Sequence, residues 1–304
     1  MELRELKYFL AIAREENISK AAEALYITQP SLSRQMQNLE KEIGKQLFIR
    51  GSKKITLTQA GLLLKKRAEE LIELYDKTCG ELSSSKGGIS GEIHIGCGES
   101  YALMTVASAA KTLIESAPDI RFNFFSADTA DVLEKLDKGL IDFGVLVLPA
   151  NISKCEYITL PDRDTWGVLM RKDSPLARKQ EISPQDLYDE PIIRSRHTMS
   201  NNIIDDWFKK DAADLNIVAT YNLIYNASLL VKQGIGYAIG LDKIINTSGE
   251  SELTFRPLCP KLETSLVFAW KKNQVFSPAA QKFLEIFKAT LNDRPALTNP
   301  TTNN

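Results

Sequence analysis

The segment from Ile27 to Gly44, ITQPSLSRQMQNLEKEIG, constrains the fold most strongly, because it has the pattern of one helix with two unlike faces. Apolar residues recur at the spacing of a core-facing helix stripe, and these are Leu32, Met36, Leu39 and Ile43. Thr28 is placed to cap the helix, and Pro30 suits its first turn. The other face carries Ser, Gln, Asn and Arg, with almost no carboxylate before Glu40. An ordinary solvated face mixes Glu with Lys, so this face is predicted to have another task.

The residues around this helix predict a small three-helix unit with a hairpin. Leu6, Phe9, Leu10 and Ala13 indicate a first helix, and Ser19 is placed to cap a short second helix, KAAEAL. Two short β-prone runs flank Gly51 and Ser52 in the segment LFIRGSKKITLT, which is typical of a hairpin. Three helices followed by a hairpin define a winged helix-turn-helix.

A DNA-binding role explains the polar face. In a winged helix-turn-helix the third helix enters the major groove, where Ser, Gln, Asn and Arg read base edges or bind phosphates and a carboxylate would be repelled. Residues 1–61 hold ten Lys and Arg against seven Glu, whereas the whole chain has a net charge of −1. A polar helix that merely lacks acids is the structural alternative. The predicted contacts to double-stranded DNA are Thr28, Gln29, Pro30, Ser31, Ser33, Arg34, Gln35 and Asn38 on the helix, and Arg50, Lys53 and Lys54 on the hairpin.

Composition limits the remaining classes. A chain of 304 residues with 43% hydrophobic and 25% charged residues is typical of a globular protein with two or three domains. The four cysteines are far apart, form no CxxC pair and have only two histidines to join them, so we expect no metal site and no cofactor. This cysteine usage fits a reduced cytoplasmic compartment. The amino-terminal residues do not have the pattern of a signal peptide, and no apolar run approaches the length of a membrane span.

Five short motifs in residues 21–61 resemble the DNA-binding domain of LysR-type transcriptional regulators. They are Ala21-Ala22, Gln29-Pro30-Ser31-Leu32-Ser33, Leu39-Glu40 with Gly44, Leu47-Phe48 with Arg50, and Leu57-Thr58 with Gly61. The match is dense over residues 1–61, and the rest of the chain matches in layout more than in motif. The resemblance implies an operator-binding regulator that forms a homodimer or homotetramer, responds to a small polar metabolite and has RNA polymerase as a further partner.

A long helix is predicted from Thr58 to about Ser85. Its apolar positions alternate spacings of four and three, which is a heptad seam. In the resembled family this linker helix pairs two subunits, whereas an amphipathic helix on a domain surface would show the same pattern. The predicted dimerisation residues are Leu64, Ala68, Leu71, Tyr75 and Leu82. The expected domains are therefore a winged helix-turn-helix at 1–58, a linker helix and hinge at 59–87, and an effector-binding domain at 88–304.

From Glu92 onward, predicted strands alternate with predicted helices, which indicates an α/β domain with a mainly parallel sheet. By resemblance, the domain has the two lobes of a periplasmic-binding-protein-like fold. Lobe I is expected at about 88–161 and 266–292, and lobe II at about 162–265. The tail PALTNPTTNN has the composition of a disordered segment.

Two other functions, those of an enzyme and of a solute-binding protein, fit the sequence less well. The motif GIGYAIG at 234–240 mimics a dinucleotide-binding loop, but it follows a predicted helix and precedes a strand, the reverse of the required order. No GxSxG motif exists and neither histidine has a Ser or Cys partner nearby in sequence, so an enzyme lacks a catalytic constellation. A solute-binding protein would need an export signal, and its amino-terminal domain would not resemble a DNA-binding domain.

The effector site is expected between the lobes, beyond the carboxyl ends of strands, where helix amino termini offer free N–H groups. The expected contacts are Glu99, Ser100, Tyr101, Ser126 and Thr129 from lobe I, and Arg194, His197 and Asn226 from lobe II. The alternatives are that Ser100 and Thr129 cap only their own helices and that Arg194 points to solvent. Because Glu99 and Asp128 oppose a purely anionic ligand, a zwitterion such as an amino acid is expected. The paired-cysteine peroxide sensing of one family subclass is not expected, since residues 195–210 contain no cysteine.

Overall fold

A computed structural model of the chain describes residues 1–51, 54–82, 88–196, 198, 202–209 and 214–292. The chain divides into two compact units, Met1–Ser83 and Ser84–Asn304, each of which is described by itself. The predictions for Lys53, for His197 and for the tail at 295–304 lie outside the described residues.

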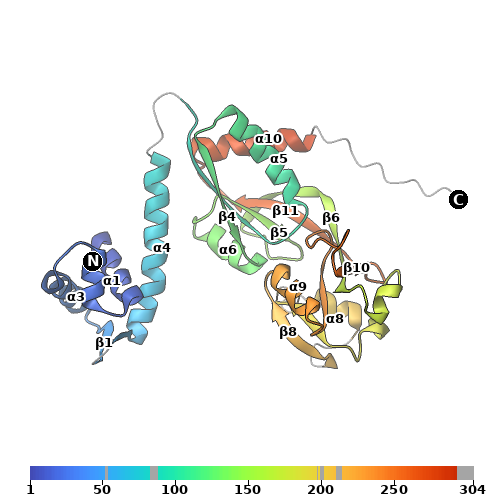
Figure 1. Ribbon diagram of the computed structural model, residues 1–304. Coiled ribbons are helices and arrows are strands. Elements are labelled where there is room, and N and C mark those ends of the chain that lie inside the picture. The colour runs from blue at the N-terminus through green and yellow to red at the C-terminus, as the bar shows by residue number, and fades with distance from the viewer. Residues whose placement is uncertain (52–53, 83–87, 197, 199–201, 210–213, 293–304) are drawn as a thin grey trace. The chain divides into compact units, whose positions relative to one another are not determined.

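The first unit is a winged helix-turn-helix followed by a long helix (Figure 1). Its helices α1, α2 and α3 pack around one apolar core that includes Phe9, Leu32 and Met36. The hairpin pairs β1 with β2 in antiparallel fashion. The bounds are α1 Leu3–Glu15, α2 Ile18–Ala24, α3 Gln29–Ile43, β1 Phe48–Arg50, β2 Ile55–Leu57 and α4 Gln59–Leu82.

Three local predictions in this unit need correction. The cap of α2 is Asn17, whose side chain accepts a hydrogen bond from the Lys20 backbone N–H, and not Ser19. Thr28 occupies the cap position of α3, but its side chain makes no capping hydrogen bond. Ile43 is 37% exposed because the core stripe of α3 ends with Leu39, one turn before the helix does.

The hairpin is fixed to the helices by backbone-directed hydrogen bonds. Glu40 Oε1 on α3 accepts from the backbone N–H groups of Leu47 at 2.7 Å and Phe48 at 3.2 Å, so this carboxylate positions the first strand of the wing. The Thr58 hydroxyl donates to Gln46 O at 2.7 Å and accepts from Gly61 N at 3.0 Å. These contacts explain why Leu-Glu and Leu-Thr-x-x-Gly recur in the sequence pattern.

The second unit is built on one nine-stranded sheet that both lobes share, in the order β4-β3-β5-β11-β6-β9-β7-β8, with β10 paired to β6. Lobe I contains β3 Gly91–Cys97, α5 Leu103–Ser116, β4 Ile120–Ser126, α6 Thr129–Asp137, β5 Phe143–Val147, β11 Glu263–Lys271 and α10 Pro278–Asn292. Lobe II contains β7 Ile192–Ser195, α8 Ile203–Phe208, β8 Ile217–Tyr221, α9 Ile224–Lys232, β9 Tyr237–Leu241, β10 Leu253–Pro257 and the short 3-10 helices Pro175–Arg178 and Pro184–Asp186.

One long strand, β6 Cys155–Arg171, belongs to both lobes (Figure 1). Its residues up to Thr165 pair with β11 in lobe I, and from Trp166 it pairs with β9 and β10 in lobe II. The sequence predicts only the second half of this strand, and it does not predict β10. The pairings within β3-β4-β5 and within β7-β8-β9 are parallel, but those made by β6 and β11 are antiparallel, so "mainly parallel" holds only for the outer strands of each lobe.

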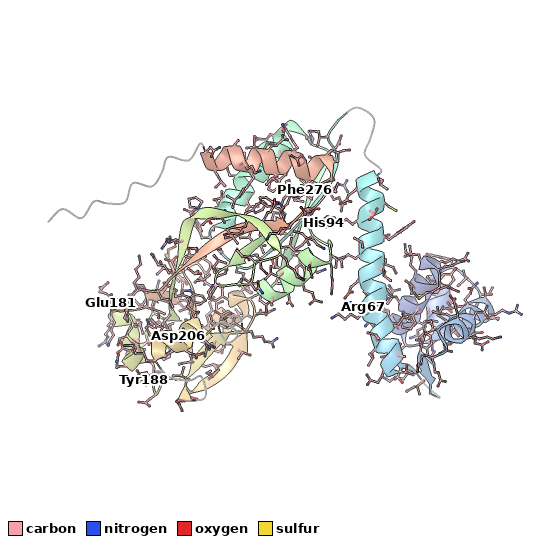
Figure 2. All side chains as sticks on the ribbon, turned by 180° about the vertical axis from the view of Figure 1, so that it is seen from behind. Arg67, His94, Glu181, Tyr188, Asp206 and Phe276 are labelled. Atoms are coloured by element: carbon pink, nitrogen blue, oxygen red, sulfur yellow. The ribbon has the colours of Figure 1, made fainter. Side chains whose placement is uncertain are left out.

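The core of lobe I is aromatic. Phe143 on β5 stacks on Phe268 of β11 with ring centroids 4.9 Å apart, and Phe268 lies 4.1 Å from Phe287 of α10. Phe276, labelled in Figure 2, lies in the loop between β11 and α10. Its ring stacks on that of Phe143 with centroids 5.2 Å apart. These contacts fasten the carboxyl-terminal strand and helix to the first half of lobe I, and they leave the cavity between the lobes to be lined by strand ends and loops.

Candidate DNA-binding surface and ligand cavity

The polar face of α3 is largely exposed. Its core side is buried through Leu32, Met36 and Leu39. On the other side Gln29, Pro30, Ser31, Arg34 and Asn38 are exposed, whereas Ser33 and Gln35 are half-buried. The structure therefore presents the predicted side chains on one surface, with Ser33 and Gln35 at its edge.

Of the predicted wing contacts, only the Lys54 side chain lies within the described part of the structure. Lys54 is exposed, but its ammonium pairs with Glu16 at 3.2 Å, so it is already held by an acid of the same unit. Arg50 ends β1, and its side chain lies outside the described part of the structure. Tyr26 was missed by the sequence pattern: it is 96% exposed in the turn before α3, with a left-handed φ of 55°.

Part of the predicted dimer seam on α4 packs against the helices of its own unit. Ala68 is fully buried there, and Leu64 packs against the core of the three-helix unit, so neither is free to form a dimer face. Lys7 of α1 reaches Asp76 at 3.6 Å and lies over the Tyr75 ring at 5.7 Å, which turns Tyr75 toward α1 as well. The assignments of Ala68 and Leu64 are therefore corrected, because these side chains pack within their own unit, whereas Tyr75 stays 48% exposed.

A second apolar stripe on α4 is exposed. Leu63, Leu71, Leu74 and Leu82 are 62%, 45%, 39% and 82% exposed. At about 100° per residue these four side chains fall within an arc of roughly 100°. Of the predicted seam, Leu71, Tyr75 and Leu82 therefore remain exposed, and the leucine stripe is rotated away from Ala68.

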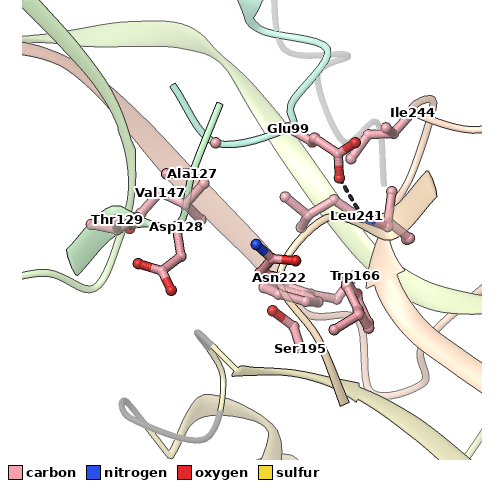
Figure 3. Close-up of a pocket in the computed structure, with 13 residues that line it drawn as sticks. Glu99, Ala127, Asp128, Thr129, Val147, Trp166, Ser195, Asn222, Leu241 and Ile244 are labelled. Atoms are coloured by element: carbon pink, nitrogen blue, oxygen red, sulfur yellow. Dashed lines mark hydrogen bonds between the residues drawn. The ribbon is translucent and has the colours of Figure 1, made fainter. Parts of the chain in front are cut away.

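A cavity of about 60 Å³ lies between the two lobes. Lobe I contributes the loop after β3, with Glu99, and the loop before α6, with Asp128 and Thr129; lobe II contributes Ser195 and Asn222 (Figure 3). Trp166, on β6 where the strand enters lobe II, forms part of the same wall. Because the strand ends of both lobes meet here, the cavity lies where ligands bind in open α/β sheets.

Glu99 joins the two lobes. Its carboxylate accepts a hydrogen bond from the backbone N–H of Ile224, the first residue of α9 (Figure 3). Burial raises the pKa of Glu99, and the Ile224 and Tyr225 donors oppose that rise. The carboxylate of Glu99, which was expected to meet the positive group of a zwitterionic ligand, thus meets the amino terminus of α9 in lobe II.

The helix termini of lobe I are partly occupied. Asp128 caps α6, since its Oδ1 accepts from Ala130 N at 3.0 Å and Asp131 N at 3.1 Å. Thr129 lines the cavity, but it is buried and its hydroxyl lies 3.5 Å from Val147 O. Ser100 accepts from Ala102 N at 3.0 Å. The cap of α6 is therefore Asp128 and not Thr129, and Ser100 does not cap α5, whose cap position is Ala102.

Three predicted residues line a neighbouring depression instead. Ser100, Tyr101 and Ser126 border an open hollow of about 340 Å³, which shares Glu99 and Ile244 with the interlobe cavity. The two hollows therefore meet at Glu99.

Two predicted residues of lobe II are not at the cavity. Arg194 is fully buried, where its guanidinium donates to both oxygens of Asp205, at 2.6 and 2.9 Å, and to Thr198. Asn226 lies in the first turn of α9 on the exposed side, and Asn222 lines the cavity in its place. Arg194 is buried because α8, which carries Asp205, covers the face of the sheet on which the Arg194 side chain lies. The local sequence does not show this packing.

Two buried polar groups near the lobe crossing lack partners among the described residues. Trp166 is 3% exposed, and its indole N–H has no acceptor. Asp164 is 6% exposed, and one of its carboxylate oxygens has no donor. Burial raises the pKa of Asp164, a hydrogen bond from Ser100 lowers it, and the charge of Asp242 raises it further.

Three further features of the described residues concern metal ligands, cysteines and membrane-spanning helices. These residues contain no cluster of three or more His, Cys, Asp or Glu that is placed to hold a metal ion. The four cysteines are free, with Cys97 and Cys155 buried. Among the described helices, none combines the length and the apolarity that crossing a bilayer requires.

A winged helix-turn-helix with an open polar recognition helix, joined to a two-lobed domain with an interlobe cavity, defines a ligand-responsive DNA-binding protein. Family comparison agrees for both parts. Residues 3–62 match the bacterial regulatory helix-turn-helix protein, lysR family, and residues 86–292 match the LysR substrate binding domain. The chain belongs to the LysR family of transcriptional regulators, which bind DNA and small-molecule effectors and form oligomers.

Individual relatives support the same assignment. The chain is 28% identical over 296 residues to the Hca operon transcriptional activator HcaR of Escherichia coli K12, covering 96% of this chain and 98% of the relative. It is 25% identical over 252 residues to the activator IlvY of Salmonella typhimurium, covering 82% and 85%. Among solved structures, the LysR family regulator CbnR has a TM-score of 0.74 at 19% identity, covering 96% of this chain and all of that one, and this likeness shows the fold.

Proposed function

We propose that this regulator recognises its operator mainly through the exposed face of α3, from Gln29 to Asn38, with Tyr26 beside it. The observation that carries the proposal is the combination of exposed Gln29, Ser31, Arg34 and Asn38 with the absence of any carboxylate on that face. Arg pairs with guanine and Gln or Asn with adenine in the major groove, and each good pair contributes about 1–3 kcal/mol of discrimination.

Subunit pairing is assigned to the free apolar stripe of α4, which consists of Leu63, Leu71, Leu74 and Leu82. An exposed leucine stripe on a helix of this length suits helix–helix packing, and pairing would place two recognition helices on one operator. A homotetramer and a contact with RNA polymerase remain predictions from the family resemblance.

The effector is assigned to the interlobe cavity. The cavity is small and combines apolar walls with Ser195, Asn222, Asp128 and the Trp166 N–H, which suits a small polar metabolite. Ligand binding would shift an equilibrium between arrangements of the two lobes, because each lobe supplies part of the wall.

Operator selection tests the DNA assignment. Duplexes selected from a random pool by the unmodified protein are compared with those selected by Arg34→Ala and by the double variant Arg34→Ala, Gln35→Ala. We expect relaxed preference at one or two base positions, with affinity for the best operator lowered by about 1–3 kcal/mol per lost base pair contact.

Lys53→Ala serves as the matched control, since loss of a phosphate contact weakens all sequences alike and lowers the salt slope by about one. Unchanged affinity and unchanged base preference in the double variant would remove α3 from the readout.

A further inference from the structure

The amino terminus of α9 is closed by a residue of the opposite lobe. The cap residue Leu223 provides no side-chain hydrogen bond to the helix, and the Asn222 side chain accepts only from Leu223 N, at 3.0 Å. The next N–H group, of Ile224, donates to Glu99, which follows β3 in lobe I. The backbone N–H of Tyr225 faces the same carboxylate and helps to lower its pKa. The chain therefore uses a distant carboxylate where most helices use a local cap.

This arrangement is chemically specific. The first turn of a helix has unsatisfied N–H groups and the positive end of the helix dipole, both of which favour a carboxylate. Glu99 reaches this position from a loop, so that its carboxylate resembles a tethered ligand more than a cap. A free carboxylate of suitable size would make the same hydrogen bonds.

A second group at the same cavity lacks a partner. The Trp166 indole N–H has no acceptor among the described residues, although Trp166 is 3% exposed and lines the cavity together with Glu99 and Ile224. Leaving a buried donor unpaired is costly, so an acceptor brought by a ligand would be favoured here. The wall thus offers two donors, one at α9 and one at Trp166.

We propose that the amino terminus of α9 is a carboxylate-binding site that Glu99 fills when no effector is bound, and that a small effector carboxylate displaces Glu99 while a second acceptor of the effector takes the Trp166 N–H. The part concerning the effector rests on the proposed function; the carboxylate site at α9 does not. Displacement would cut the hydrogen bond by which Glu99 joins the lobes and would free its carboxylate in a cavity that Asp128 also lines, where an ammonium group of the same ligand would be attracted.

Chemical rescue tests the site without any knowledge of the effector. Glu99→Ala removes the tethered carboxylate, and sodium propionate, which has the three carbons of the glutamate side chain, then supplies a free carboxylate. Hydrogen exchange of the Ile224 and Tyr225 amides is measured in the full chain, with and without millimolar propionate. We expect these amides to exchange about tenfold faster in Glu99→Ala, as for the loss of a charge-assisted hydrogen bond, and propionate to restore much of the protection.

Matched controls separate the site from general effects. Propionamide has the same shape without the charge and should not restore protection, and sodium chloride at the same ionic strength should not either. Glu250→Ala, at an exposed loop position of the same unit, should leave both amides unchanged. Glu99→Gln, which keeps the side-chain size, should show intermediate exchange and no rescue, and it serves if Glu99→Ala does not fold.

Two results would overturn the inference. Equal exchange of both amides in Glu99→Ala and the unmodified chain would show that Glu99 does not close α9 in solution. Faster exchange without propionate rescue would show that the helix end does not bind a free carboxylate. Because neither measurement involves DNA or an effector, a failure of the operator or effector assignments leaves this result standing, and the reverse also holds.

Discussion

At the scale of single residues, Arg194 shows how burial decides a role. Its fully buried guanidinium forms a two-point contact with Asp205, and its other donors reach Thr198. A side chain so committed has no donor to offer a ligand. Breaking a buried pair by removing one partner leaves the other charge uncompensated, which is strongly destabilising.

Arg194→Ala is therefore expected to lower the free energy of unfolding by about 3–5 kcal/mol. Denaturant unfolding followed by circular dichroism measures the effect on the carboxyl-terminal unit. Arg178→Ala, at an exposed arginine of the same lobe, should change it by less than about 0.5 kcal/mol. A stable Arg194→Ala protein that had lost only its effector response would restore Arg194 to the ligand site.

Asp164 gives a pH dependence with a defined sign. Burial is the largest cause that raises its pKa above the ordinary 3.8, so the folded chain holds this proton more firmly than the unfolded chain does. The free energy of unfolding should then fall as pH rises from about 3.8 through the raised folded pKa, and the loss is complete once the pH lies well above that folded pKa.

Asp164→Asn should flatten this part of the stability–pH curve, as measured by urea midpoints between pH 4 and pH 7. Asp173 should show the opposite pH dependence, since its hydrogen bond with Arg171 lowers its pKa. Its contribution to the free energy of unfolding is therefore lost as the pH falls. An unchanged slope in Asp164→Asn would mean that Asp164 titrates alike in the folded and unfolded chains.

At the scale of elements, the wing depends on one carboxylate. Glu40 accepts two backbone N–H groups at the start of β1, and Gly61 lets α4 approach the same strand, because a Cβ there would lie 2.2 Å from Leu47 O. We expect Glu40→Ala to lower the stability of the first unit by about 1.5–3 kcal/mol, the range for hydrogen bonds to a charged group.

Thermal unfolding and operator affinity report this effect together. Operator affinity should fall with the stability, because a loosened β1 no longer holds the wing against the duplex. Glu23→Ala, at an exposed glutamate of α2, is the control and should change neither quantity measurably. If Glu40→Ala melted like the unmodified protein, another contact would have to position the wing.

The linker helix offers a test with an internal control. Leu71 and Leu62 are similarly exposed, at 45% and 51%, but nine residues separate them and place them on opposite sides of α4. Leu71→Arg should dissociate the dimer in sedimentation velocity by placing a charge in an apolar interface, with operator affinity falling as well. Leu62→Arg should sediment like the unmodified protein; the reverse pattern would move the interface to the other face.

At the scale of the whole molecule, the sequence predicts most elements and fewer contacts. The recognition helix, the wing, the linker helix and most strands of both lobes follow from local periodicity and turn residues. The continuity of β6 and the presence of β10 do not, because β6 pairs with β9 and β11, and β10 pairs with β6, across long stretches of the chain. Periodicity reports which face of an element is apolar and says little about what covers it.

The candidate sites divide in the same way. The polar face of α3 is predicted correctly in its exposure because a helix face is a local property. Ala68, Arg194 and Asn226 are placed wrongly because each role depends on a distant element: α1 beside α4, the α8 residue Asp205 beside β7, and the orientation of α9. Trp166 is missed because its unpaired N–H is visible only in three dimensions.

The shared strand β6 and its neighbour β11 also set an order of assembly during synthesis. Lobe II and its pairings on β6 lie within residues 166–257, whereas β11, at the centre of the lobe I sheet, begins only at Glu263. A nascent chain can therefore close lobe II while the edges of β5 and β6 in lobe I stay unpaired. Open strand edges template association with other chains, so the interval before β11 emerges from the ribosome is when this protein is most exposed to misassembly.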